Sequence, residues 1–312
     1  MKTKRTRRPA AEAQRPRAHS PMRKASLPRL AAAFYAALEN FNGTVRRVQK
    51  KLSGVHVHET RVAGRRLLAW LELLTPVLEP TVRKELCGMV KKHLRALGNL
   101  RDVQVQRSQV KPLMSRFAAA RPFCRWLSQK ENKLARKAGK RLQAGGGSQP
   151  WRRVERRCRR QVSRALEIIE QDALARLILQ RVELAQAEAR DLLERVDPAE
   201  TSSIHRTRIA FKKLRYMLNA LGPELPAFSA SRRARMQRYQ SIMGRVQDLE
   251  TLLARFEKYQ RRHGADPAAD ALFRGALIRR RDQSVQAFLD IAGRLEEYWV
   301  PIFQRKELQA AK

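Results

Sequence analysis

A short basic motif occurs twice in this 312-residue chain. Each copy has a histidine, an arginine three residues later, and a pair of basic residues that begins four residues after the arginine. These residues are His58, Arg61, Arg65 and Arg66 in the first copy, and His205, Arg208, Lys212 and Lys213 in the second. Arginine donates paired hydrogen bonds to phosphate oxygens and lysine supplies a compact positive charge. Both copies are therefore suited to binding phosphate or another anion.

A second element follows each copy of the motif. Residues 97–102 read Leu-Gly-Asn-Leu-Arg-Asp, and residues 243–248 read Met-Gly-Arg-Val-Gln-Asp. The two histidines are 147 residues apart (205 − 58), and the two aspartates are 146 residues apart (248 − 102). Two elements repeated in the same order at nearly the same offset indicate an internal duplication.

The elements that must position these residues are helices. Period-two strand patterns are absent after residue 27, and glycine and proline cluster at a few junctions. Ser202 or Ser203 is expected to cap the helix that carries the second motif. We expect helices at 29–52, 56–79, 80–111, 113–143, 151–196, 202–221, 229–263 and 267–307.

On a helical projection each motif helix has one apolar face and one basic face. The basic face of the second helix also carries Arg215 and Tyr216, whereas the first copy has Leu68 at the position that matches Arg215. An ordinary amphipathic surface helix is the alternative interpretation. Such helices usually mix charge signs, because Glu–Lys pairs four residues apart stabilise them.

The motif helices instead place like charges four residues apart. Arg61 and Arg65 form such a pair, and so do Arg208 and Lys212. Each pair destabilises a helix by about a few tenths of a kcal/mol unless an anion lies between the charges. This spacing favours a binding role for the arginines and lysines. For the two histidines a purely structural role stays open.

The helix that follows each motif offers further side chains. We predict that four basic residues form the walls of the site: Lys91, Lys92, Arg95 and Arg238. Asp102 and Asp248 are predicted to orient arginines of the motif helices, which is a structural role and not a catalytic one. A metal site is not expected, because no histidines or carboxylates stand at ligand spacing.

Composition narrows the class of partner. The chain has 67 Lys and Arg against 29 Asp and Glu, a formal net charge of +38. So large an excess indicates a polyanionic partner: nucleic acid, polyphosphate or an anionic membrane surface. Three isolated cysteines indicate reduced thiols and a cytoplasmic location, and no apolar run is long enough to span a bilayer.

The chain divides into a few segments. Residues 1–27 are predicted to be a disordered basic arm, and residues 308–312 a short tail. The Gly-rich stretch 145–150 is predicted to link a first helical half, 28–144, to a second, 151–307.

These motifs resemble the CHAD family, the histidine-marked α-helical domain, over about residues 28–307. The resemblance rests on the two His–Arg–basic-pair motifs and on the Leu-Gly-x-x-Arg-Asp element, which the second copy keeps with Met243 and Gln247 in place of Leu and Arg. It implies an all-α fold of two four-helix bundles related by pseudo-twofold symmetry, with a basic central groove or pore. It also implies binding of inorganic polyphosphate and association with polyphosphate granules. Some members of the family are fused to a CYTH domain, whose strand signature is Glu-x-Glu-x-Lys. That signature is not found here, so the chain resembles a stand-alone member.

The chemistry agrees with a polyphosphate-binding protein that is not an enzyme. A linear polyanion without bases requires only spaced cations along a groove. The alternative is a nonspecific nucleic-acid-binding protein, and weak DNA or RNA binding is compatible with the basic arm. Single-strand binders add aromatic platforms, and only Tyr216 lies on a basic face here. Clustered carboxylates and a Gly-rich phosphate loop are absent, so we expect no catalysis and no cofactor. The oligomeric state is not fixed by these patterns.

Overall fold

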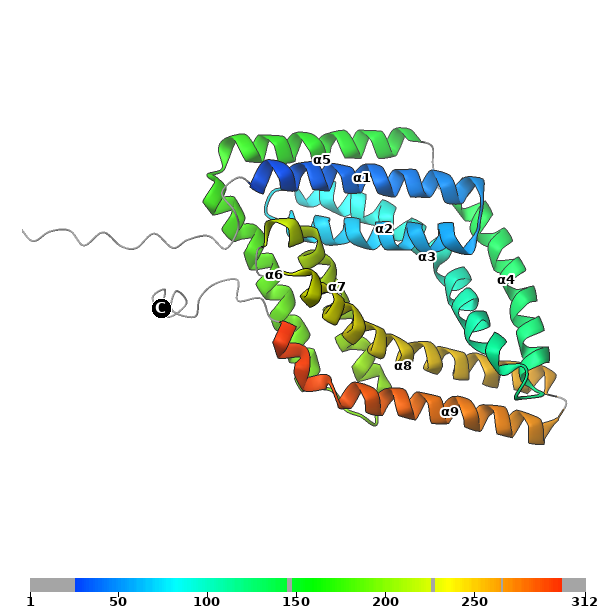
Figure 1. Ribbon diagram of the computed structural model, residues 1–312. Coiled ribbons are helices and arrows are strands. Elements are labelled where there is room, and N and C mark those ends of the chain that lie inside the picture. The colour runs from blue at the N-terminus through cyan, green and yellow to red at the C-terminus, as the bar shows by residue number, and fades with distance from the viewer. Residues whose placement is uncertain (1–25, 145–147, 226–227, 265, 299–312) are drawn as a thin grey trace, which may run out of the picture.

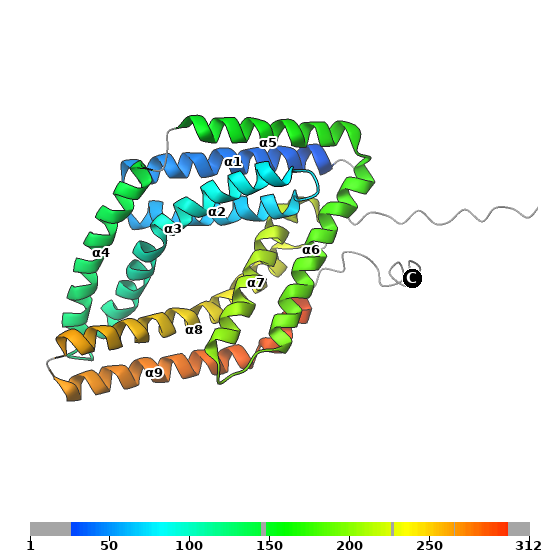
Figure 2. The same cartoon turned by 180° about the vertical axis from the view of Figure 1, so that it is seen from behind.

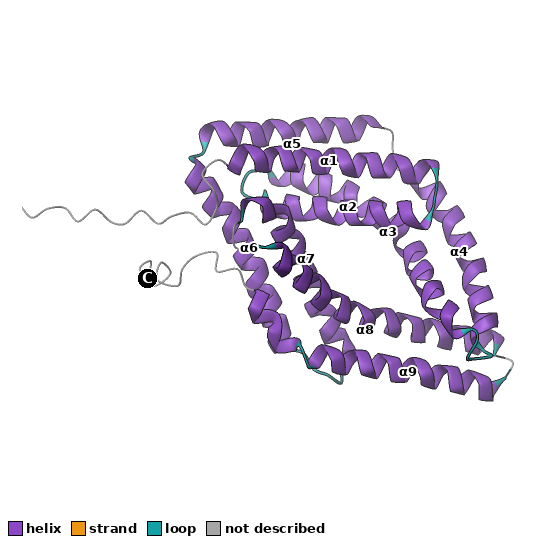
Figure 3. Ribbon diagram, viewed as in Figure 1, coloured by secondary structure: helices purple, strands orange, loops and turns teal. Residues whose placement is uncertain are grey.

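The computed structural model describes residues 26–144, 148–225, 228–264 and 266–298, and every regular element among these residues is a helix (Figure 3). The predicted all-α fold class is therefore confirmed. The predicted N-terminal arm up to residue 25, the linker glycines 145–147 and the tail 308–312 lie outside the described residues. The α-helices are α1 (Ser26–Lys50), α2 (Gly54–Leu73), α3 (Pro80–Val110), α4 (Ala120–Gln143), α5 (Ser148–Ile168), α6 (Gln171–Glu194), α7 (Thr201–Leu221), α8 (Ala230–His263) and α9 (Pro267–Leu289).

The predicted single helix 151–196 is wrong, because the chain forms two helices there. α5 ends at Ile168, and Glu170 adopts an extended conformation (φ −53°, ψ 137°) before α6 begins at Gln171. No glycine or proline marks the break in the sequence. α5 packs against α1 and α3, so residues that the sequence assigned to the second half lie against the first.

Two smaller boundaries also differ from the prediction. Residues 113–119 do not belong to α4, because Lys111–Leu113 forms a 3-10 helix that contains Pro112 and turns follow it. The last predicted helix, 267–307, is shorter: α9 ends at Leu289, and a 3-10 segment, Ala292–Tyr298, follows it.

The helices form a four-sided frame (Figures 1 and 2). α1, α2 and α5 lie along one side, and α8 and α9 lie along the opposite side. α4 connects these two sides at one end, and α6 and α7 connect them at the other. The two motif helices, α2 and α7, pack against each other, and this contact positions the candidate site.

Three hydrophobic clusters of buried residues hold the described helices together. The smallest joins α1, α2, α3 and α4. The largest joins α1, α2, α3, α5, α6, α7, α8 and α9, and includes the fully buried Phe34, Leu67 and Phe211. The remaining cluster joins α4 to α8 and α9 at a far corner through Phe123, Phe256, Tyr259 and Phe273. Phe256 and Phe273 meet edge to face with ring centroids 4.8 Å apart. Aromatic pairs of this kind add to the stabilisation from buried area.

Candidate anion-binding site

The N-terminal turn of α2 is held in place by side-chain hydrogen bonds. Ser53 caps the helix, and its hydroxyl accepts a hydrogen bond from the His56 backbone N–H at 3.1 Å. Thr60 is buried, with its hydroxyl 2.8 Å from the carbonyl of His56 and 3.1 Å from the carbonyl of Thr44 in α1. This contact fixes α2 against α1 and therefore fixes the direction of the first basic face.

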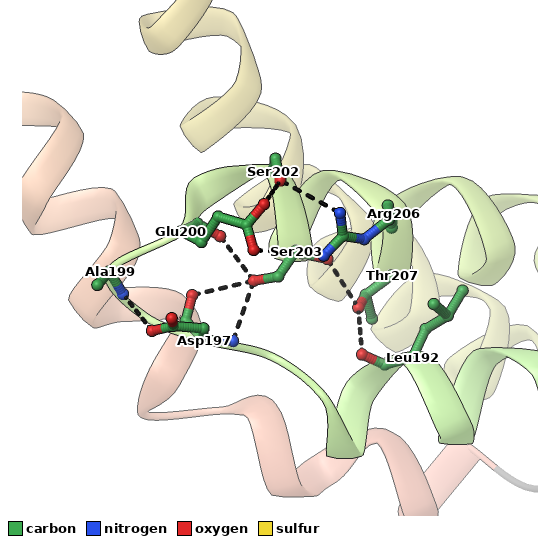
Figure 4. Close-up of polar contacts among 8 residues, drawn as sticks. All are labelled: Leu192, Asp197, Ala199, Glu200, Ser202, Ser203, Arg206 and Thr207. Atoms are coloured by element: carbon green, nitrogen blue, oxygen red, sulfur yellow. Dashed lines mark hydrogen bonds and ion pairs between the residues drawn. The ribbon is translucent and has the colours of Figure 1, made fainter.

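The corresponding turn of α7 is anchored by a denser network (Figure 4). The cap residue is Glu200, so the prediction of Ser202 or Ser203 at this position is wrong. The buried Ser203 hydroxyl accepts a hydrogen bond from the Asp197 N–H at 3.1 Å and donates one to the Glu200 carbonyl at 2.7 Å. Thr207 repeats the arrangement of the first copy, with its hydroxyl 2.9 Å from the carbonyl of Leu192 in α6.

The glycine of each second element makes room for the arginine of the neighbouring motif. Arg61 Nη1 donates to the Leu94 carbonyl at 3.1 Å and would lie only 3.5 Å from a Cβ placed on Gly98. Arg208 Nε would lie 3.6 Å from a Cβ placed on Gly244. The two motif arginines therefore lie across the backbones of α3 and α8.

The aspartates of these elements act on the same arginines. The charge of Asp102 raises the pKa of Arg61, and that of Asp248 raises the pKa of Arg208, although burial lowers the pKa of both arginines overall. Both aspartates thus attract the arginines that the sequence predicted they would orient.

Two pockets flank the α2–α7 contact. The α1-side pocket has a volume of about 880 Å³, and the α3-side pocket has a volume of about 620 Å³. Four side chains line both pockets and form a shared wall between them: Arg65, Arg208, Lys212 and Tyr216. Three of the four wall residues are cations of the two motifs, so the predicted basic faces do come together here.

The α1-side pocket is lined by cations without a carboxylate among its lining residues, all of which belong to the described part of the chain. In addition to the wall, His58, Arg66 and Arg215 line it. Arg215 is only 9% exposed, and its Nε donates to Gln240 Oε1 at 2.7 Å. Its guanidinium carbon lies 4.8 Å from the centre of the Tyr216 ring. The buried Arg215 is therefore held at one orientation, and Arg66 is exposed to solvent.

The α3-side pocket contains an acid that the sequence analysis did not select. Glu72 accepts a short hydrogen bond from Arg181 of α6 and lies 3.7 Å from Lys213 Nζ and 3.9 Å from Arg83 Nη1. Burial alone would raise the pKa of Glu72, but the Arg181 hydrogen bond and the neighbouring cations lower it below its ordinary value. Glu72 is therefore ionised at neutral pH and partly neutralises this pocket.

Charge crowding is strongest at the wall. Burial lowers the pKa of Lys212 to about 6, and the charges of Arg65, Arg208, Arg61 and Arg215 contribute to the shift. Burial and the adjacent Arg65 likewise lower the pKa of Arg61 to about 10. A buried cation beside other cations is unfavourable unless an anion compensates it. The wall is therefore a region of strong repulsion between basic groups.

The two histidines stand at the edges of this charge cluster. Burial lowers the pKa of His58, with further lowering by Arg101 and Arg65. Burial lowers the pKa of His205 too, together with Arg208 and Lys212. Both imidazoles are therefore mostly neutral at pH 7. His205 Nδ1 and Arg208 Nε are buried and have no hydrogen-bond partner among the described residues.

The structure separates the predicted residues into two groups. Ten line one or both pockets: His58, Arg65, Arg66, Lys91, His205, Arg208, Lys212, Lys213, Arg215 and Tyr216. Lys92, Arg95 and Arg238 are exposed and line neither pocket, and Arg61 is held on α3 behind the wall. Gln237 and Gln240, not Arg238, face the α1-side pocket from α8.

The described residues contain no group of three or more His, Cys, Asp or Glu side chains that could hold a metal ion. No described helix is both long enough and apolar enough to cross a membrane.

Comparison with known proteins places the chain in a family. The model of the CHAD domain family matches residues 30–257, which is well over half of the chain. The chain belongs to the CHAD family. The CHAD family is linked in general to polyphosphate binding. No curated protein matches the chain.

Two solved structures share this CHAD fold. The CHAD domain of the plant Ricinus communis superposes with a TM-score of 0.62 at 19% identity, covering 85% of this chain and 91% of that one. PptA from Streptomyces chartreusis superposes with a TM-score of 0.60 at 15% identity, covering 87% of this chain and 99% of that one. At these identities the likeness concerns the fold alone.

Proposed function

We propose that this CHAD protein binds inorganic polyphosphate, without converting it, across the wall between the two pockets. The observation that carries the proposal is the wall itself: Arg65, Arg208 and Lys212 converge from both motif helices. A polyphosphate chain carries negative charge on every unit and offers phosphate oxygens to each of these groups. It therefore relieves the repulsion that the empty site contains.

The ligand contacts follow from the chemistry of each side chain. Arg65, Arg66 and Arg215 donate to phosphate oxygens in the α1-side pocket, and Lys212 supplies a point charge at the wall once binding has protonated it. His205 and Arg208 also line the α3-side pocket, where they can bind phosphates on the other side of the wall. Because the two pockets meet at the wall, a linear chain can contact both.

Nucleic acid is a weaker candidate for the same site. Single-strand binding adds base stacking on aromatic side chains, worth about 1–3 kcal/mol per base. The two aromatic residues that line the α1-side pocket, Trp70 and Tyr216, are 5% and 9% exposed. Both rings are packed in the protein interior and offer little face to a base. A polyanion without bases therefore fits the pocket better.

We place the protein in the cytoplasm on polyphosphate granules. This location follows from the proposed ligand, and a fluorescent fusion would test it. The fusion should co-localise with stained granules in cells that accumulate polyphosphate and should disperse in cells that cannot synthesise it. A fusion that follows stained DNA in both kinds of cell would favour nucleic acid.

A competition experiment tests the ligand directly. Labelled long-chain polyphosphate is bound to the protein and challenged with single-stranded DNA, duplex DNA and tripolyphosphate at about 150 mM salt, where exposed charges are well screened. We expect polyphosphate to resist DNA present in large excess of phosphate. Displacement by DNA on equal terms per phosphate would contradict the proposal, and release of orthophosphate with a divalent metal would show an enzyme.

A further inference from the structure

A second concentration of positive charge lies on α5, away from the two pockets. This helix carries seven arginines in 21 residues: Arg152, Arg153, Arg156, Arg157, Arg159, Arg160 and Arg164. Its apolar residues Trp151, Val154, Cys158 and Val162 are buried in the cluster shared with α1 and α3. One side of α5 is therefore fixed against the protein, and the arginines occupy the remaining surface.

Four of these arginines form a stripe along the outer side of the helix. Arg153, Arg156, Arg160 and Arg164 follow one another at intervals of three, four and four residues. On a helical projection they fall within about 80° of one another, on the side opposite the buried apolar residues. The stripe is about 16 Å long at 1.5 Å per residue. A hollow of about 500 Å³ on this helix is lined by five arginines: Arg153, Arg156, Arg157, Arg159 and Arg160.

The described carboxylates neutralise two other arginines of α5 and none of the four in the stripe. Arg157 pairs with Glu79 and Glu85, at 3.9 and 3.3 Å, and Arg159 pairs with Glu39 and Glu155. By contrast, no carboxylate of the described residues lies within ion-pair distance of four arginines that are all exposed: Arg153, Arg156, Arg160 and Arg164. Like charges three and four residues apart destabilise a helix. The repetition of such pairs along α5 therefore favours a function that uses the charge.

The α5 stripe is separate from the wall. No residue of α5 lines either pocket, and α1 contributes Ala33, Ala36 and Asn40 to the α1-side pocket. α5 lies on the outer edge of the frame beside α1, as both views show (Figures 1 and 2). A short ligand held at the wall therefore does not reach the α5 stripe.

We propose that the outer face of α5 is a second polyphosphate-binding surface, so that one protein molecule holds two separate segments of polyphosphate. This inference rests on the proposed function. Guanidinium groups bind phosphate oxygens in pairs, and a row of them matches a chain of phosphates better than a row of lysines would. The large hydrophobic side chains exposed in the described part include no aromatic residue, so the surface lacks a base-stacking platform. The apolar stripe of α5 is already buried, which leaves no apolar face for insertion into a membrane.

Two binding surfaces on one molecule have a physical consequence. A long chain can occupy both surfaces, and two different chains can be held by one protein. The protein would then cross-link polyphosphate strands instead of only coating them.

The test replaces four arginines of the stripe by glutamine: R153Q, R156Q, R160Q and R164Q in one variant. The control is K133Q, R136Q, K137Q and K140Q on α4, four exposed basic residues on one face of that helix with the same change in charge. Circular dichroism and thermal unfolding establish that each variant is folded. Titration calorimetry with a short polyphosphate of defined length gives the stoichiometry, and light scattering with long chains gives cross-linking.

We expect wild type and the α4 variant to bind about two short chains per protein, and the α5 variant to bind about one and to lose cross-linking. A variant with R65E and K212E at the wall should keep the chain bound at α5. The inference is overturned if wild type binds one chain, if the α5 variant still binds two, or if the α4 variant loses as much as the α5 variant. It is also overturned if the α5 variant loses duplex DNA binding and keeps both polyphosphate chains.

Failure of the proposed function looks different. In that case short polyphosphate binds to none of the proteins, or its only binding is lost in the α5 variant and is unaffected by R65E and K212E.

Discussion

The α1-side and α3-side pockets share a wall but differ in charge. The α1-side pocket adds Arg66 and Arg215 to the wall cations, and no carboxylate is among its lining residues in the described chain. The α3-side pocket adds Lys213 together with Glu72. Glu72 and Asn219 are 147 residues apart, the same offset as the two motif histidines (219 − 72 and 205 − 58). One difference between the copies therefore separates a fully cationic pocket from a partly neutralised one.

This comparison shows that a repeated basic motif does not give two equal binding surfaces. Lys213 is already paired with Glu72 and with Glu188, at 3.7 and 3.1 Å. A phosphate that binds Lys213 must compete with these carboxylates, whereas one that binds Arg66 displaces only solvent. We therefore expect the α1-side pocket and the wall to supply most of the affinity, and the predictions below test this difference.

The largest effect is expected at the wall, which both pockets share. The double variant with Arg65→Glu and Lys212→Glu should lower the affinity for polyphosphate by at least about 100-fold. Hydrogen bonds to charged groups contribute about 1.5–3 kcal/mol each, and a factor of ten corresponds to about 1.4 kcal/mol. Equilibrium binding of labelled chains measures the change. Arg261→Glu with Arg279→Glu, two exposed residues outside both pockets, is the control and should change affinity only slightly.

The second effect is a pH dependence of binding. Lys212 has a pKa of about 6 in the free protein, because of burial and of the surrounding arginines, and a bound polyanion should raise that pKa. Above pH 6 binding must therefore take up a proton, and affinity should fall by about tenfold or more between pH 6 and pH 8. Calorimetry in buffers of different ionisation enthalpy counts the protons. The Lys212→Arg variant keeps its charge throughout and should lose most of this dependence.

Lys212 should also make the stability of the folded protein depend on pH, with a sign opposite to that of binding. In the unfolded chain Lys212 regains its ordinary pKa of 10.5, so between about pH 6 and 10.5 the unfolded state binds more protons than the folded state. The free energy of unfolding of the ligand-free protein should therefore rise with pH across this window. A Lys212→Met variant without ligand should be more stable at pH 6 than the wild type and should show a flatter curve. If the free energy of unfolding varied with pH equally in both proteins, the fold would not lower the pKa of Lys212.

A third test exchanges the residues that distinguish the two pockets. Asn219→Glu places a carboxylate in the α1-side pocket and should weaken polyphosphate binding by about tenfold, the effect of one unfavourable charge. Glu72→Asn removes the carboxylate from the α3-side pocket and should strengthen binding by a few-fold, at some loss of stability because Arg181 loses its partner. If the two variants changed affinity equally and in the same direction, the pockets would not differ as described.

The smallest effect is expected at the glycines. A Cβ at Gly98 would lie 3.5 Å from Arg61 Nη1 and one at Gly244 would lie 3.6 Å from Arg208 Nε, both ordinary contacts. Gly98→Ala and Gly244→Ala should therefore change affinity by less than about twofold and raise helix stability by up to about 1 kcal/mol. Gly244→Leu should displace the Arg208 guanidinium and weaken binding much more. Thermal unfolding and binding of all three variants would show whether the glycine is needed only for space.

The sequence predicted well what depends on one helix. The period of the apolar residues gives the helices and the side on which His58, Arg65, Arg208 and Lys212 lie, because these follow from local geometry. The sequence also indicates that Arg61 belongs with Gly98 and Arg208 with Gly244, because the arginine motif and the glycine element repeat at nearly the same separation.

What depends on contacts between distant helices was not predictable in this way. In the sequence Glu72 is a single acid on a helix with both apolar and basic residues. Its effect on the pocket depends on its contacts with Arg181 of α6 and Lys213 of α7, which only the fold brings beside it. Lys92 and Arg238 have the right residue type but point away from the pockets, which local spacing could not decide. The break at Ile169 and Glu170 likewise has no glycine or proline to mark it in the sequence.

The Thr60 and Thr207 hydroxyls bond each motif helix to its preceding helix, α1 or α6, whereas the wall cations meet only where α2 and α7 dock. The ligand-free protein is therefore stiff within each helix pair and electrostatically strained between them. A polyanion bound at the wall binds the docked form and not the separated one, so it adds to the free energy of unfolding by RT ln(1 + [L]/Kd), about 2.7 kcal/mol at a ligand concentration 100 times Kd. The thermal stability of this protein should thus report how much polyanion surrounds it.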